Sequence, residues 1–73
     1  MVDYDLAGIP ERLKAFRKER GLTQTELAER CGFVQPAITR WETGGVELSL
    51  PNAVRLCKAL DVSLDQLCGR IDR

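Results

Sequence analysis

The chain has 73 residues, 11 basic and 11 acidic side chains that leave a formal net charge of zero, and no histidine. This length fits one small globular domain, and the lack of histidine excludes Ser-His-Asp and Cys-His catalytic centres and zinc sites with histidine ligands. The neutral charge also argues against an ordinary nucleic-acid-binding protein, because such proteins are usually basic.

Neither a membrane segment nor a secretory signal is expected. No apolar run approaches the roughly 20 residues that span a bilayer, and the N-terminal stretch lacks the apolar core of a signal peptide. The three cysteines, Cys31, Cys57 and Cys68, form no CxxC pair, so we expect no metal and no cofactor. We interpret them as small apolar side chains of a reduced, cytoplasmic protein. The alternative is a redox-sensing thiol, for which Cys68 is the candidate.

Residues 1–8 form a short acidic segment that we expect to be a flexible, partly frayed lead-in. A first helix is predicted over residues 10–20, because Leu13 and Phe16 are spaced three apart and give it a buried stripe. Gly21 supplies the left-handed residue that commonly ends a helix.

Two short helices are predicted next, over residues 24–31 and 35–43. Thr23 and Glu26 match a capping box at the start of the first of them. Gly32 ends that helix, so only about three residues connect the pair.

A fourth helix begins after a Ser49 cap, with Pro51 in its first turn, and a fifth begins after a capping box that opens at Ser63. The apolar stripe of the fourth helix consists of Ala53, Leu56, Cys57 and Leu60. Strand signals are absent, because β-branched residues are few and no period-two alternation occurs. The sequence therefore predicts an all-α, five-helix domain over residues 9–69, followed by a short tail over residues 70–73.

The two short helices meet the requirements of a helix-turn-helix unit. Ala28 is small where the second helix must approach, and Gly32 tolerates the left-handed geometry of the turn. Ile38 and Trp41 provide two apolar contacts that fix the second helix and leave its other face free.

Two stretches carry a resemblance to a known family: GLTQTELAERCGFVQPAITRWETG and SLPNAVRLCKALDVSLDQL. They resemble the helix-turn-helix and the last two helices of the Cro and phage-repressor (XRE) family. The resemblance implies a compact lambda-repressor-like domain that binds a double-stranded DNA operator with the helix over 35–43 in the major groove. It implies a sequence-specific transcriptional regulator, with repression as its expected action. The alternative is an antitoxin or adaptor whose main ligand is a partner protein, whereas an enzyme has no support.

The resemblance also implies two sets of DNA contacts on this sequence. The base-reading residues are Gln35, Pro36, Thr39 and Arg40. The phosphate contacts are Gln24, Thr43, Gly44 and Lys14. Gln can bond adenine and Arg can bond guanine through two hydrogen bonds each. The sequence departs from the family at Val34, where a Ser or Thr cap is usual, and at Pro36, where a polar base-reading residue is usual.

By the same resemblance, Arg17 and Glu42 are expected to form a buried ion pair that orients the base-reading helix. One helix-turn-helix reads about half an operator, so a homodimer is expected. Its contacts are expected in the last helix and the tail, at Leu64, Leu67 and Ile71. Basic side chains gather over residues 12–20, and the zero net charge then predicts low non-specific affinity and a shallow salt dependence.

Overall fold

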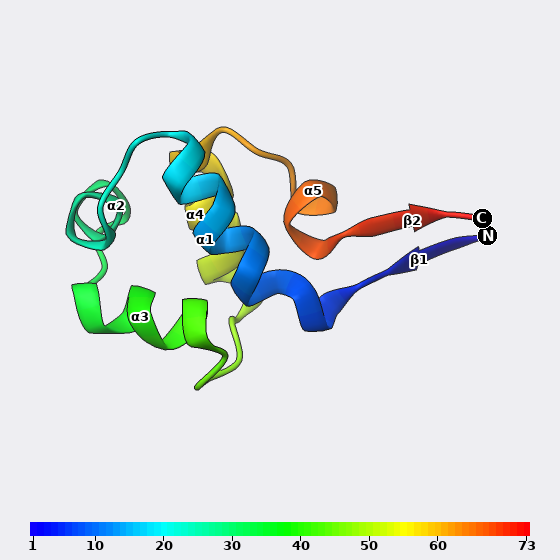
Figure 1. Ribbon diagram of the computed structural model, residues 1–73, viewed down its shortest axis with the longest axis horizontal. Helices are drawn as coiled ribbons and strands as arrows, with labels where there is room; N and C mark the ends of the chain where they lie inside the picture. Colours follow the sequence, from blue (N-terminus) through cyan, green and yellow to red (C-terminus); the bar gives the residue numbers. More distant parts are fainter.

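The computed structural model describes residues 1–73 and contains five α-helices, as the sequence predicts (Figure 1). The helices are α1 (Ile9–Glu19), α2 (Gln24–Cys31), α3 (Gln35–Thr43), α4 (Leu50–Leu60) and α5 (Leu64–Cys68). The observed bounds of the first three lie within one residue of the predicted ones. None of these helices has the length and apolar character that crossing a bilayer requires.

The prediction that the chain contains no strands is wrong. β1 (Val2–Tyr4) and β2 (Arg70–Asp72) pair antiparallel, with Asp3 opposite Ile71. Strands of three residues are too short to show a period-two pattern, and each pairs with a segment distant in sequence. The predicted lead-in and tail therefore form a two-stranded ribbon, which projects from the helices (Figure 1). A 3-10 turn over Leu6–Gly8 joins the ribbon to α1.

The helix starts follow the predicted caps. The Thr23 hydroxyl accepts a hydrogen bond from the Glu26 N–H (3.1 Å), and the Glu26 carboxylate accepts one from the Thr23 N–H (2.9 Å). These bonds from Thr23 hold the pKa of Glu26 below its ordinary value. Ser63 and Gln66 form the same box at α5. Val34, which stands where the family usually has Ser or Thr, precedes α3, and no side chain caps the start of this helix.

The core lies where α1 packs on α3 and where α4 packs on α2 and α5. Its fully buried side chains are Leu13, Leu27, Ile38, Leu56, Leu60 and Leu67. Leu67 is 1% exposed, so the prediction that it contacts a second copy is wrong in this structure. Cys31 and Cys57 are buried as well, and burial raises the pKa of both thiols. Both therefore fill space in the core, whereas Cys68 is half-buried.

Candidate nucleic-acid interface

α3 is held against the core by one face only. Gly32 adopts φ 73° in the turn after α2, and α3 starts three residues later. Ile38 is fully buried and Trp41 is 8% exposed, and the Trp41 ring meets Phe33 edge to face with ring centres 4.9 Å apart. The guanidinium carbon of Arg55 lies over the Phe33 ring, 4.2 Å from its centre. The opposite side of α3 is left exposed to solvent.

A buried ion pair joins α1 to α3. Arg17 Nε donates to Glu42 Oε2 at 2.7 Å and Arg17 Nη2 donates to Glu42 Oε1 at 3.0 Å. The remaining Arg17 nitrogen donates to the Leu22 carbonyl at 2.8 Å. Both charged residues are 7% exposed, and the hydrogen bonds to Glu42 raise the pKa of Arg17 further. The two-point contact fixes how α3 is rotated about its own axis relative to α1.

Gln24 connects this ion pair to the predicted base-reading residues. Its side-chain carbonyl accepts hydrogen bonds from Gln35 Nε2 (2.7 Å) and from the Thr39 hydroxyl (2.9 Å). Its amide nitrogen donates to Glu42 Oε1 at 3.2 Å. Gln35 Nε2 also donates to the Thr39 hydroxyl at 2.8 Å. The network runs from the buried carboxylate of Glu42 to the first residue of α3.

The sequence prediction assigned Gln24 to a phosphate and missed this connection. Gln24 is the first residue of α2 and Gln35 is the first residue of α3. The available signal was that both residues begin a helix, so that their side chains can meet where the two helices come together. The structure brings Gln24, Gln35 and Thr39 together and leaves Arg40 and Pro36 outside the network.

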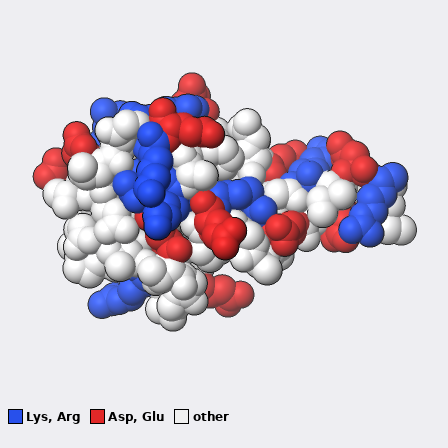
Figure 2. Space-filling view, in the orientation of Figure 1, with Lys and Arg blue, Asp and Glu red and all other residues white.

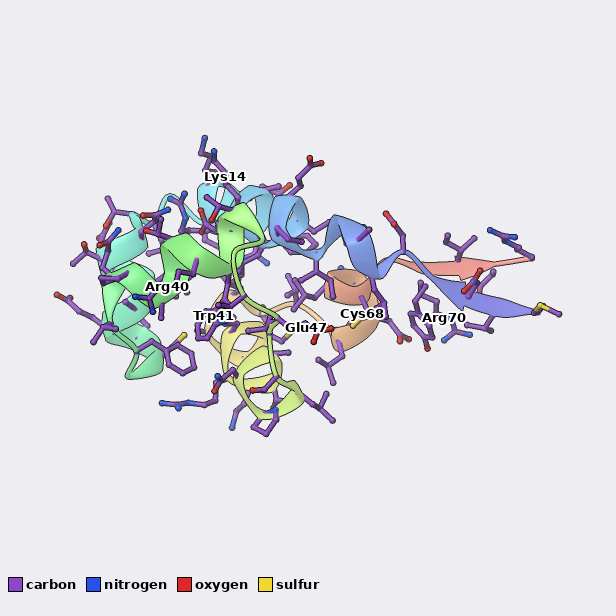
Figure 3. All side chains as sticks on the ribbon, turned by 90° about the horizontal axis from the view of Figure 1, so that it is seen from below. Lys14, Arg40, Trp41, Glu47, Cys68 and Arg70 are labelled. Atoms are coloured by element: carbon purple, nitrogen blue, oxygen red, sulfur yellow. The ribbon has the colours of Figure 1, made fainter.

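Arg40 and Pro36 are exposed and lie four residues apart on α3, so they share one face. The Arg40 guanidinium makes no hydrogen bond or ion pair within the chain, and it projects from α3 in Figure 3. At the end of the helix, the Thr43 hydroxyl donates to the Thr39 carbonyl at 2.9 Å. Gly44 follows at φ 77° and terminates α3.

The local charge on α3 differs from the neutral total. Glu42 is the only acid in α3, and its charge is buried against Arg17. The exposed face of this helix therefore carries one positive charge, from Arg40, and no negative charge. In Figure 2 the surface over α3 is mostly uncharged, whereas the ribbon shows acids and bases side by side. Lys14, exposed on α1, lies at the edge of the view in Figure 3, apart from Arg40.

The residues predicted as dimer contacts do not form one surface. Leu64 lines an apolar hollow of about 470 Å³, Leu67 forms part of its buried wall, and Ile71 lies on β2. Sequence reasoning missed the exposed side chains around this hollow, which are Leu6, Val46 and Leu50. They come from separate turns and helix starts, where no periodic pattern marks an apolar face.

The chain is similar in sequence to known proteins. A family model described as Helix-turn-helix matches residues 13–67. The uncharacterized HTH-type transcriptional regulator YqaE of Bacillus subtilis is 40% identical over 57 residues, which make up 78% of this chain and 49% of that protein. The cryptic phage CTXphi transcriptional repressor RstR of Vibrio cholerae is 36% identical over 62 residues, or 85% of this chain and 55% of that protein. The chain thus spans about half the length of these curated relatives.

Among solved structures, the chain is similar to the P22 c2 repressor crystallised with a synthetic operator. The two superpose with a TM-score of 0.76 at 36% sequence identity, over 81% of this chain and 89% of that one.

Proposed function

Because the chain belongs to the helix-turn-helix family of the Cro and phage-repressor (XRE) type, we propose that it is a sequence-specific transcriptional regulator that binds double-stranded DNA and acts as a repressor. Family membership confirms the resemblance seen in the sequence, the lambda-repressor-like fold and the prediction that this domain is not an enzyme. One observation carries the proposal. The exposed face of α3 presents the unbonded Arg40, and half-buried Gln35 begins the same helix, which is oriented by a buried ion pair.

Arg40 and Gln35 are the proposed polar base-reading residues. The five N–H donors of Arg40 match the O6 and N7 acceptors of guanine, a contact that supplies about 1–3 kcal/mol of discrimination. The side-chain oxygen of Gln35 accepts no bond within the chain, so it is available to the amino group of adenine. Its Nε2 would leave Thr39 to reach adenine N7 while it keeps its bond to Gln24. Pro36 has no side-chain donor and would contact a thymine methyl.

The phosphate contacts proposed for this domain lie around the same helix. The Thr43 hydroxyl and the amide of Gly44 lie at the end of α3, and Lys14 offers a free ammonium on α1. Gln24 keeps one N–H for a phosphate, because its other N–H donates to Glu42. These few contacts imply a salt dependence with a small slope, since the slope follows the number of phosphates neutralised.

Repression and dimerisation complete the proposal. RstR is a transcriptional repressor by name and the P22 c2 repressor is seen with an operator, which supports the same action here. A two-fold dimer would read two half-sites about 34 Å apart, or a multiple of that distance.

Selection of binding sites from random duplex DNA tests the proposed function. We expect the wild type to select a defined sequence, and Gln35→Ala and Arg40→Ala each to lose the preference at its own base position. Lys58→Ala, which removes an exposed cation from α4 instead, is the matched control and should select the wild-type sequence. If the folded wild type selects no sequence even at low salt, the proposal fails.

A second candidate is an adaptor or antitoxin whose main ligand is a protein. The observation in its favour is the apolar hollow with Leu6, Val46 and Leu50 at its rim, because large exposed apolar patches commonly mark protein contacts. Leu50→Glu distinguishes the two candidates. It should leave DNA selection by α3 intact if the first proposal holds.

A further inference from the structure

β2 has one edge that nothing in the chain covers. Its other edge pairs with β1. The hydrogen bonds at the two ends of the ribbon show which residues of β2 direct their backbone groups to β1 and which direct them to the open edge. The Arg73 N–H donates to the Met1 carbonyl at 2.7 Å, and the Asp5 N–H donates to the Gly69 carbonyl at 3.0 Å. In an antiparallel ladder every second residue faces the partner strand. Residues 69, 71 and 73 therefore direct their backbone groups towards β1.

Arg70 and Asp72 direct their backbone N–H and C=O groups the other way, to the open edge. Both residues are exposed, and the ribbon stands clear of the helices in Figure 1. A row of unpaired backbone donors and acceptors is a template for a further strand.

The open edge of β1 differs from that of β2. The Tyr4 N–H, which points to that edge, already donates to the Asp3 carboxylate at 2.8 Å. A second β1 paired on itself would also place Asp3 against Asp3, and like charges directly opposite are destabilising. An added strand is therefore favoured at β2 and disfavoured at β1.

The sequence Arg70-Ile71-Asp72 is complementary to itself in one antiparallel register. When the two-fold axis passes at Ile71, each Arg70 lies opposite the partner's Asp72, and the two outward-facing residues of each strand exchange four backbone hydrogen bonds. The two Ile71 side chains, 36% exposed in the single chain, then meet as a close pair that makes no backbone hydrogen bonds. Registers centred on Arg70 or on Asp72 would instead place like charges opposite each other.

The charges on the ribbon reinforce this register. Within one chain Arg70 bonds Asp72 at 2.9 Å and Asp65 at 3.1 Å. A second strand in this register places the partner's Asp72 opposite Arg70 and the partner's Arg70 opposite Asp72, so that two arginines and two aspartates alternate in a two-by-two patch on one face. Figure 3 shows Arg70 next to the ribbon and away from α3.

We infer that a second copy of this chain pairs along β2, centred on Ile71, and that the two ribbons form one four-stranded antiparallel sheet. This inference rests on the homodimer of the proposed function and names the surface that forms it. The interface is isologous, because each strand contributes the same residues to its partner. It also leaves α3 of each copy uncovered.

Sedimentation equilibrium of charge variants tests the register. The wild type should associate from 8.2 kDa to twice that mass. Arg70→Asp alone and Asp72→Arg alone each place like charges opposite each other, so each should weaken self-association about tenfold or more. An equimolar mixture of the two variants restores opposite charges across the strands and should recover the wild-type dimerisation constant. The double variant carrying both changes should recover it too.

Lys58→Asp, the same change of charge on α4, is the control and should dimerise like the wild type. Far-ultraviolet circular dichroism checks that all variants keep their helices. Three results would overturn the inference: a wild type that stays monomeric, single variants that dimerise normally, or a mixture that fails to recover. A dimer insensitive to these charges but lost in Leu50→Glu would place the contact at the apolar hollow and also overturn it.

Failure of this inference and failure of the proposed DNA binding give different results. If the wild type dimerises but selects no DNA sequence, the β2 dimer is supported and the proposed operator binding is rejected. A wild type that selects DNA but remains monomeric on a duplex with two half-sites would do the reverse.

Discussion

The ion pair between α1 and α3 and the two-stranded ribbon use charge in opposite ways. Arg17 and Glu42 are 7% exposed and bonded at every charged atom, whereas the side chains of Arg70 and Asp72 are 43% and 76% exposed. A buried pair is costly to break because the remaining charge has no water around it. Exposed pairs contribute little to stability, but their arrangement decides which register a second strand can adopt. The first pair orients a helix, and the second selects a partner.

Removing one member of the buried pair should have the largest effect. Arg17→Met leaves the Glu42 carboxylate buried without its partner, and we expect the free energy of unfolding to fall by about 3–5 kcal/mol. Urea unfolding measures this loss. Arg70→Met, the matched change in the ribbon, should shift the unfolding midpoint far less. Equal effects of the two variants would show that burial does not separate the two regions.

Gln24 tests whether the hydrogen bonds between α2 and α3 position the proposed base-reading residues. Gln24→Ala removes the acceptor that holds Gln35 and Thr39. Affinity for the selected operator should then fall about tenfold, because each of these two part-buried hydrogen bonds contributes about 1 kcal/mol. Fluorescence anisotropy with operator and scrambled duplexes measures both affinities. Positioning of Gln35 and Thr39 predicts a larger loss on the operator than on scrambled DNA, where only the phosphate contact of Gln24 is lost. A uniform loss on both duplexes, with an unchanged salt slope because glutamine carries no charge, would make Gln24 a phosphate contact only.

The helix pattern and the ribbon also differ in how well sequence predicts them. Each helix carries its own start and end signals within a few residues, such as the capping boxes at Thr23 and Ser63. The exposed face of α3 followed from the predicted burial of Ile38 and Trp41, whereas the base-reading residues on it remain a prediction from the family resemblance. The ribbon could not be predicted, because its strands are three residues long and pair across the whole chain. The Gln24 network was missed because side-chain partners depend on how two helices cross.

Because α3 lacks a side-chain cap, a substitution at its N-cap should stabilise this helix. Val34 is 66% exposed and has the extended backbone of a cap residue (φ −96°, ψ 149°). Val34→Ser supplies a hydroxyl for the first free N–H groups of α3, so we expect a gain of about 1 kcal/mol in the free energy of unfolding. Thermal unfolding measures it, with Thr23→Ala as the reverse change at α2. A loss of stability in Val34→Ser would mean that the Val34 side chain has a role of its own.

The smallest expected effect concerns pH. The pKa of Glu26 is lower in the folded chain than in the unfolded one, because Thr23 donates to its carboxylate. Its contribution is therefore complete above the ordinary glutamate pKa of about 4.3 and is lost as the pH falls through the lower folded value. Stability measured from pH 6 to pH 3 should decline more for the wild type than for Glu26→Gln. Parallel curves for the two proteins would show that the Glu26 carboxylate makes no such contribution to stability.

Arg40 of α3 is the residue proposed to read a guanine in the major groove. The most direct measurement is a double-mutant cycle on the selected operator, combining Arg40→Ala with replacement of the contacted guanine by 7-deazaguanine, which lacks the N7 acceptor. Anisotropy titrations of the four combinations give the coupling free energy. The account predicts a coupling of about 1–3 kcal/mol. A coupling of zero, with each single change weakening binding on its own, would contradict it.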